Sequence, residues 1–364
     1  MHSNRKHLPD IIAQEFRLPE IDADACVYAT FDQANCKDCV DACPKQAWVL
    51  DDYALGLDTD ACDGCGLCVP ACPSGALHIH FPWVIRTFGG RQIALVACEY
   101  SDINEGAGIL PCIHALGLRQ LLLLYNSGIK YLLVATAECE NCTRHCPTGI
   151  HHQLDQLNCL LHERKKPPMK ILERSSQVWK TVFNTDEVIS QGTQMPRRHF
   201  LRGGGRLLRR QLLVLDPLNF RESRTVPPGQ LLPMTDNNNV HWPWAPRLDE
   251  SQCNGCDACM NLCPTNALEL IYDEEESLTR YQVNPANCTG CGVCATVCER
   301  ESISVHSFSL STSRTIYLAE KRCTACGNTF HLPRHNDSQS DAPFCRICRE
   351  HNHSRNLYQV LNEN

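Results

Sequence analysis

Apolar residues occur in short runs along this chain rather than in long periodic stretches. Two runs in the middle, "RQIALVAC" ending at Cys98 and "KYLLVATAEC" ending at Cys139, are bounded by glycine or charged residues. Continuous apolar runs of this length are typical of strands buried on both faces of a parallel sheet. Between them, "CIHALGLRQLLLLYNSG" predicts a helix that Gly128 stops.

A second amphipathic helix is predicted in "GIHHQLDQLNCLLHERKK". It places Leu154, Leu157 and Leu161 near one face together with Cys159, which we interpret as a core residue. The order strand, helix, strand, helix predicts a small central α/β domain with a parallel sheet over residues 90–175.

Four further segments each combine a cysteine rhythm with a short β-like run. They read "CKDCVDACPKQAWVL", "CDGCGLCVPACPSGALHIH", "CNGCDACMNLCPTNALELI" and "CTGCGVCATVCERESISV". The last three contain the complete C-x2-C-x2-C-x3-C run of bacterial-type ferredoxins, whereas the first begins at Cys36 and has Gln33 where its first cysteine would fall. Residues 23–86 and 247–310 therefore resemble two bacterial-type 2[4Fe-4S] dicluster ferredoxin domains.

In such runs the fourth cysteine ligates the neighbouring cluster, so the copies pair. This exchange predicts three complete [4Fe-4S] ligand sets, namely Cys43, Cys62, Cys65 and Cys68; Cys253, Cys256, Cys259 and Cys298; and Cys263, Cys288, Cys291 and Cys294. A fourth set has Cys36, Cys39 and Cys72 and lacks one ligand. We expect Cys26 to complete it through a longer loop; a three-iron cluster or a ligand from another domain are the alternatives.

The composition points to thiolates committed to metal. The chain has 364 residues and 26 cysteines, and "MHSNRKHLPDIIAQEF" lacks the apolar core of a secretory signal, which argues against a secreted disulfide-rich protein. No apolar run is long enough to span a membrane, which leaves peripheral association open. A net charge of −7 gives no basic field for nucleic acid. We therefore expect a cytoplasmic protein whose thiolates hold iron or zinc.

Five more cysteines converge on the predicted central sheet. Cys98 and Cys139 follow its strands, at the carboxyl ends where open α/β sheets place their sites. Cys112, Cys142 and Cys146 complete the group, and "CENCTRHCP" repeats the spacing of the first cysteine segment. A metal site is predicted here, in which Cys112 is either a ligand or a packed residue.

The central segments "VACEYSD", "LPCIHALG" and "YNSGIKYLLVATAECENC" resemble the delta (iron–sulfur) subunit of methyl-viologen-reducing hydrogenases. That subunit passes electrons between a hydrogenase and a heterodisulfide reductase. The resemblance implies that Cys98, Cys112, Cys139, Cys142 and Cys146 hold an additional iron–sulfur cluster, either [2Fe-2S] or [4Fe-4S].

Two further segments carry no ferredoxin pattern. Residues 1–22 are predicted as an N-terminal extension and residues 176–246 as a linker. The linker includes the arginine-rich "MPRRHFLRGGGRLLRRQLL", which we interpret as solvated, with a basic strap lying on an acidic partner as the alternative.

The tail, residues 316–364, contains two C-x2-C pairs formed by Cys323, Cys326, Cys345 and Cys348. Four thiolates complete a tetrahedral shell, so the pairs predict a zinc-ribbon-like module with one structural zinc ion. A rubredoxin-like iron site is the rival interpretation. His331 and His335 lie between the pairs and are interpreted as surface residues.

The predicted architecture is therefore an α+β multidomain chain, with two ferredoxin-like domains, a central α/β domain and a zinc-ribbon-like tail. The sequence contains no P-loop and no HExxH or GxSxG motif, so we expect no catalytic activity of its own. The first functional hypothesis is a polyferredoxin that relays single electrons to or from a larger redox enzyme, such as a hydrogenase, a heterodisulfide-reductase-like enzyme or a formate dehydrogenase. The alternatives are a maturation factor for a molybdenum or iron–sulfur enzyme and an iron–sulfur redox sensor.

Overall fold

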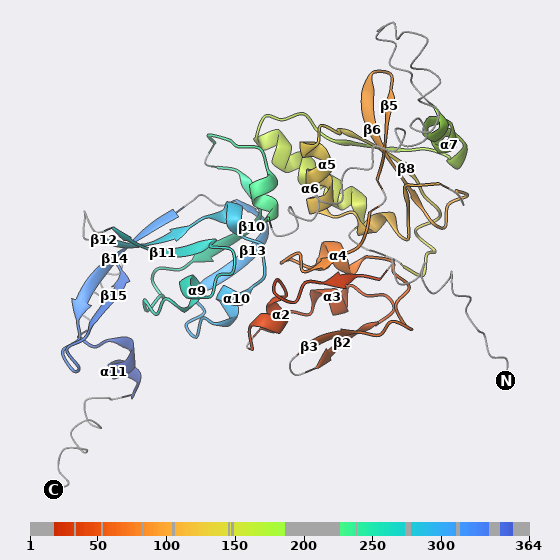
Figure 1. Ribbon diagram of the computed structural model, residues 1–364. Coiled ribbons are helices and arrows are strands. Elements are labelled where there is room, and N and C mark those ends of the chain that lie inside the picture. Colours follow the sequence, from red (N-terminus) through yellow and green to blue (C-terminus); the bar gives the residue numbers. More distant parts are fainter. Residues whose placement is uncertain are drawn as a thin grey trace, which may run out of the picture. The chain divides into compact units, whose positions relative to one another are not determined.

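The computed structural model (Figure 1) describes most of the chain in two ranges. These are 18–185 and 226–351, apart from 33, 52–53, 82, 104–105, 145, 147–148, 238, 274–277, 311–313 and 335–342. The predicted extension up to residue 17, the arginine-rich segment, Gln33, His335 and the end of the tail lie outside the described residues.

The chain divides into two compact units. The first comprises residues 1–30, 37–226 and 231–233, and the second comprises residues 31–36, 227–230 and 234–364. The first unit therefore holds one cysteine-rich domain and the central sheet, and the second holds the other cysteine-rich domain and the tail.

The first cysteine-rich domain is built from very short elements. In chain order they are β1 (Glu20–Ile21), α2 (Val27–Thr30), α3 (Asp38–Asp41), β2 (Trp48–Asp51), β3 (Ala54–Leu57), α4 (Cys68–Ala71) and β4 (Leu77–His78). The first and last strands pair antiparallel, and β2 and β3 form the hairpin between them. Its core contains Trp48, Val69 and Leu77 together with the thiols of Cys39 and Cys68. So little apolar surface is typical of domains that need a metal to stabilise them.

The central sheet confirms the predicted parallel strands. Its strands are β5 (Val84–Phe88), β6 (Arg91–Cys98), β7 (Ile109–Leu110), β8 (Tyr131–Ala135) and β9 (Lys170–Glu173), in the order β5-β6-β8-β9 with β7 paired to β6. The β6–β8, β8–β9 and β6–β7 pairs are parallel, whereas β5 is antiparallel to β6. β5 and β9 were not predicted, and β5 lies across the expected boundary between the two domains.

The two predicted helices both form, with one difference each. The first is α5 (Leu118–Asn126), which starts later than expected because a single 3-10 turn, η1 (Ile113–Ala115), precedes it. Gly117 separates the two, and a Cβ at this position would lie 2.6 Å from the Pro70 Cβ. After α5 the chain turns at Gly128, whose φ of +86° is a conformation that glycine adopts readily.

The second predicted helix is α6 (Ile150–Glu163), with Leu154, Leu157 and Leu161 buried as expected. The interpretation of Cys159 as a core residue is wrong, because its side chain is exposed. Two residues along an α-helix turn by about 200°, so Cys159 points away from the face that Leu157 and Leu161 share.

A third helix, α7 (Ser176–Asn184), lies in the segment predicted as a linker. It packs on the opposite face of the sheet from α5 and α6 (Figure 1). The Trp179 side chain is 1% exposed, its Nε1 donates to the Val96 carbonyl oxygen at 3.0 Å, and its ring stacks on Phe183 with centroids 5.1 Å apart. The linker interpretation therefore fails for residues 176–184.

The second unit repeats the ferredoxin-like arrangement. Its elements are η4 (Pro228–Leu231), β10 (His241–Leu248), α9 (Ala258–Asn261), β11 (Leu268–Asp273), β12 (Leu278–Val283), η5 (Pro285–Asn287), α10 (Val293–Thr296), β13 (Ile303–Leu310), β14 (Arg314–Arg322), β15 (Thr329–Pro333) and α11 (Arg346–His351). As in the first domain, the outer strands β10 and β13 pair antiparallel and β11 and β12 form a hairpin. β10 also occupies part of the predicted linker.

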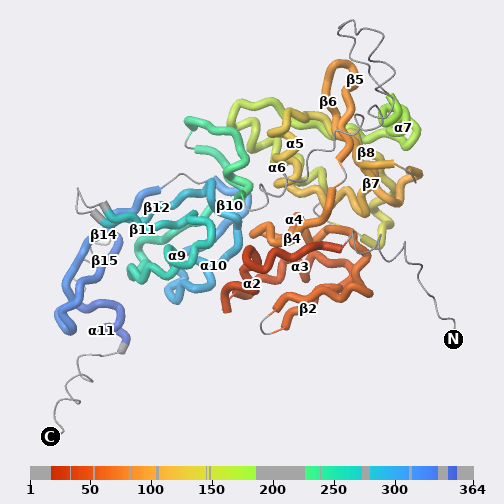
Figure 2. The backbone as a smooth tube through the Cα atoms, viewed as in Figure 1, coloured from red at the N-terminus to blue at the C-terminus, as the bar shows by residue number. Residues whose placement is uncertain are grey.

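The tail extends the sheet of this second domain. β14 pairs antiparallel with β12, with Ile316 opposite Tyr281, and β15 pairs with β14. Figure 2 shows β12, β14 and β15 leading to α11. In the described part of the chain no helix is long and apolar enough to cross a membrane.

Trp179→Ala tests whether α7 belongs to the central domain. Removal of a buried indole that also donates a hydrogen bond is expected to lower the free energy of unfolding by roughly 3–5 kcal/mol. Thermal unfolding followed by circular dichroism measures the change. Val178→Ala is the matched control on the same helix, since Val178 is 43% exposed. Equal stability of the two variants would contradict the packing of α7 on the sheet.

Candidate metal centres

The second ferredoxin-like domain brings its predicted thiols together in two groups. Burial raises the pKa of Cys253 to about 11 and that of Cys259 to about 12, and the nearby charges of Cys256 and Cys298 add to both shifts. These four residues are the set predicted from the exchange of the fourth cysteine.

The other group in this domain surrounds a small cavity of about 20 Å³. Its thiols are those of Cys263, Cys288, Cys291 and Cys294. Burial raises the pKa of Cys288 to about 12, and the charges of Cys291 and Cys263 contribute. Cys259 of the first group also raises the pKa of Cys294, which shows that the two groups are neighbours.

The raised pKa values of these buried thiols indicate what kind of bound species would stabilise their thiolate form. Desolvation disfavours the thiolate, and a bound cation reverses this effect by supplying positive charge at the sulfur. Backbone N–H groups supply further stabilisation, because Ala267 N donates to Cys263 Sγ at 3.2 Å and Ser302 N donates to Cys298 Sγ at 3.3 Å. Hydrogen bonds to sulfur tune the reduction potential of iron–sulfur clusters. The two sets of cysteines, with these N–H donors, therefore fit such clusters.

The first domain assembles one group in the same manner. Burial raises the pKa of Cys68, and the charges of Cys65, Cys62 and Cys43 contribute to the rise. Ala47 N donates to Cys43 Sγ at 3.4 Å, in the same position relative to the cysteine as in the second domain.

The partner group predicted for this domain consists of its four remaining cysteines. Cys39 is buried in the domain core, with Cys72 packed against the same cluster. Cys36 is half-buried. Cys26 is buried immediately before α2. The assignment of these four residues to one cluster stays a prediction.

A repeated turn makes Cys26 the structural equivalent of Cys253. Cys26 N donates to the Asp22 carbonyl oxygen at 3.1 Å, and Cys253 N donates to the Asp249 carbonyl oxygen at 3.2 Å. In both domains the aspartate follows the first strand, and its own N–H donates to the chain beside the last strand. Cys26 thus has the same place relative to its turn as Cys253, and α2 lies between Cys26 and the next cysteine, Cys36.

The same turn precedes Cys62, whose N–H donates to the Asp58 carbonyl oxygen at 3.0 Å. The carboxylate of this aspartate also accepts hydrogen bonds from Asp60 N and Ala61 N, as an Asx-type turn requires. The signal is visible in the sequence as "DADAC", "DTDAC" and "DESQC", and sequence reasoning missed it.

All five central cysteines line one cavity of about 590 Å³. Burial raises the pKa of Cys112 to about 12, with contributions from the charges of Cys98 and Cys146. Burial likewise raises the pKa of Cys139, with contributions from Cys98 and Cys142. The cavity also contains Arg144, a buried side chain that sequence reasoning did not single out.

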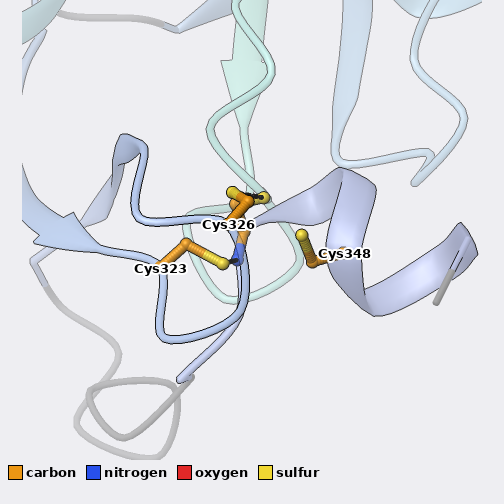
Figure 3. A group of neighbouring side chains, drawn as sticks. Cys323, Cys326 and Cys348 are labelled. Carbon is orange, nitrogen blue, oxygen red and sulfur yellow. Dashed lines mark hydrogen bonds between the residues drawn. The ribbon is translucent and has the colours of Figure 1, made fainter. Parts of the chain in front are cut away.

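The tail forms a four-thiol site. The sulfurs of Cys323, Cys326, Cys345 and Cys348 all lie within 4.8 Å of one another. Cys323 and Cys326 come from the turn between β14 and β15, and Cys348 comes from α11 (Figure 3). The Cys326 and Cys345 sulfurs are 3.8 Å apart. When four sulfurs surround a metal tetrahedrally at about 2.3 Å, neighbouring sulfurs lie about 3.8 Å apart. The site therefore fits one metal ion held by four thiolates.

The interpretation of His331 as a surface residue needs correction, because its side chain is half-buried and 15% exposed. Its Nε2 lies 2.8 Å from Asp257 Oδ1, which also accepts a hydrogen bond from the Tyr281 hydroxyl at 2.5 Å. A Cβ at Gly255 would lie 2.0 Å from the His331 carbonyl oxygen, so β15 lies directly against the loop between Cys253 and Cys259. The tail therefore braces a cysteine loop of the ferredoxin-like domain.

Comparison with known proteins agrees with this geometry. Residues 34–77 and residues 252–302 each match a family model described as a 4Fe-4S dicluster domain. A protein of Rickettsia felis named "Ferredoxin" is 36% identical over 79 residues, which cover 21% of this chain and 72% of the Rickettsia protein. The two matched dicluster regions and this degree of identity show that the chain belongs to the ferredoxin family of iron–sulfur proteins.

Proposed function

We propose that the chain is a polyferredoxin that relays single electrons to or from a larger redox enzyme. The proposal rests on one observation above all: three four-thiol groups at ferredoxin positions and a further five-thiol cavity occur in one chain. When bound, iron–sulfur clusters supply one-electron oxidation and reduction, with potentials set by sulfur hydrogen bonds, charge and burial. The protein's part is to hold, desolvate and space these groups.

Four [4Fe-4S] clusters are proposed for the two dicluster domains. Three would be held by the thiol groups that the fold brings together. The fourth would use Cys36, Cys39 and Cys72 with Cys26 as the remaining ligand, which the equivalence of Cys26 and Cys253 supports.

An additional cluster is proposed for the central cavity, in line with the resemblance to the hydrogenase delta subunit. A cluster commonly takes four protein thiolates, and the cavity offers five, so Cys112 is either a ligand or a packed neighbour. The same resemblance proposes a hydrogenase or a heterodisulfide-reductase-like enzyme as the partner. A formate dehydrogenase is proposed as a third partner class because multi-cluster ferredoxins of this general type accompany such enzymes.

A structural zinc ion is proposed for the tail. Burial alone would raise the pKa of Cys323, but hydrogen bonds from the backbone N–H groups of Cys345, Cys326 and Ala325 lower it. A site that favours a thiolate in this way fits a closed structural shell.

A maturation factor for a molybdenum or iron–sulfur enzyme is the second candidate function. The contact of His331 and Gly255 favours it, because a metal-held tail that braces a cysteine loop is not required for electron transfer alone. Such a tail would instead suit a maturation factor that docks on its target enzyme in a controlled way.

Cys26→Ser tests the proposed repair of the incomplete cluster. We expect the variant to lose about four iron atoms relative to wild type after anaerobic reconstitution, or to lose about one and show a three-iron centre. Iron analysis and low-temperature EPR measure the change. Cys159→Ser is the control, since Cys159 is exposed on α6. Unchanged iron content in Cys26→Ser would rule out this ligand.

Cys348→Ser tests the metal in the tail. Wild type is expected to retain about one zinc ion per chain and the variant to lose it, because three thiolates leave the tetrahedral shell open. Elemental analysis of protein from cells grown with both iron and zinc gives the metal content. A red protein with rubredoxin-type absorption at this site and no zinc would favour the rival iron interpretation.

Electron exchange distinguishes the two candidate functions. The dithionite-reduced, desalted chain is expected to support turnover of an active heterodisulfide-reductase-like enzyme or formate dehydrogenase as the sole electron source. Stopped-flow absorption of the chain and product formation measure this exchange. The relay proposal is wrong if the active enzyme takes no electrons from the reduced chain. If, in addition, the inactive apoenzyme needs the chain to become active, the maturation function is correct.

A further inference from the structure

Arg144 lies between two cysteines of the central cavity and is almost completely buried. Its side chain is 4% exposed. Its Nε donates to Asp63 Oδ2 at 2.7 Å, and its Nη1 donates to Glu99 Oε1 at 2.5 Å and to the Pro111 carbonyl oxygen at 2.7 Å. The guanidinium also lies over the Tyr100 ring, 4.8 Å from its centroid.

Each acceptor of Arg144 stands next to a metal-ligand candidate. Asp63 follows Cys62 in the first ferredoxin domain. Glu99 follows Cys98 and Pro111 precedes Cys112, both in the central cavity. One side chain therefore joins a cysteine loop of the ferredoxin domain to two cysteine segments of the central site.

The two thiol groups also share a buried hydrophobic cluster. Cys65 of the ferredoxin domain and Cys112 of the central site belong to one buried cluster with Leu67, and Cys146 packs against it. The two sites are therefore neighbours within the first unit, on either side of the Arg144 hydrogen bonds.

The charge of Arg144 lies beside both groups. Its guanidinium donates to Asp63, inside the loop from Cys62 to Cys65, and to Glu99, which directly follows Cys98. Arginine suits this position because its rigid fork binds two carboxylates at once, which a lysine ammonium cannot reproduce.

We propose that Arg144 is a positioning residue that fastens the central cysteine site to the ferredoxin site of Cys43, Cys62, Cys65 and Cys68, and that its charge sets the reduction potential of both. This inference rests on the proposed function, in that both sites are taken to hold iron–sulfur clusters. Reduction of either centre adds one electron and no proton, so the reduced form is more negative by one unit. A buried cation at the junction therefore favours the reduced form at both sites.

Arg144→Met removes the charge and the hydrogen bonds at similar volume. We expect two of the chain's centres to become harder to reduce, each by at least tenfold in the one-electron equilibrium constant, which is about 59 mV. Dithionite titration with redox mediators, followed by EPR, measures each potential. Arg86→Met is the control, because Arg86 is a half-buried arginine in β5 of the same unit whose guanidinium likewise lies over an aromatic ring, that of Phe183.

Two further variants separate charge from bracing. Glu99→Gln removes a negative charge from the same junction, so we expect the opposite shift, toward easier reduction. Arg144→Lys keeps the charge and loses the fork, so we expect nearly wild-type potentials but faster hydrogen exchange of the loop around Cys62 and Cys65. A residue with a purely structural role would not give shifts of opposite sign in Arg144→Met and Glu99→Gln.

The outcomes distinguish this inference from the proposed function. If wild type shows no reversible centres, the relay proposal fails, and hydrogen exchange of the Cys62–Cys65 loop in Arg144→Met still tests the bracing. Wild-type iron content with unchanged potentials and unchanged exchange in Arg144→Met would overturn the inference. Equal shifts at every centre, or the same shifts in Arg86→Met, would overturn it as well.

Discussion

Burial of the cysteine thiols governs how both ferredoxin domains are built. Each ferredoxin domain places thiols at its centre, where burial disfavours the thiolate unless a cation is bound. The helices around them have only four residues each, so they bury too little apolar surface to stabilise the domain without help. Metal binding and folding are then one event, because the ligands are also the core.

The fold uses two devices to bring thiols into place. A turn with aspartate four residues before the cysteine positions the first cysteine of a loop, as at Cys26, Cys62 and Cys253. Side chains from outside the loop then hold it, with Arg144 in the first unit and His331 in the second. Both of these contacts end on an aspartate within a cysteine loop, which indicates that the loops need external support in addition to their own hydrogen bonds.

Much of this arrangement could be predicted from the sequence, because the relevant signals are local. The cysteine spacing predicted the groups around Cys68, Cys259 and Cys294, and the apolar runs predicted β6 and β8. The missed features depend on tertiary contacts. β9 is four half-exposed or exposed residues without an apolar run, and α7 is fixed by one buried tryptophan.

Other errors had a physical cause that pattern reading does not capture. Cys159 was assigned to the core by residue type, although helical geometry turns it away from the apolar face. His331 was taken as a surface residue because its partner, Asp257, is 74 positions away in the chain. The turn before Cys26 is visible in the sequence, but its likeness to the turns before Cys62 and Cys253 is recognised only from their hydrogen bonds.

The number of iron atoms bound by the intact chain decides whether its thiols hold four [4Fe-4S] clusters. Mössbauer spectroscopy of ⁵⁷Fe-labelled, anaerobically loaded protein gives both the number of iron atoms and their cluster type. The account predicts at least roughly sixteen iron atoms per chain, nearly all in cubane-type sites, from four [4Fe-4S] clusters. Well under this number in fully loaded protein, or iron bound mainly as isolated ions, would contradict it.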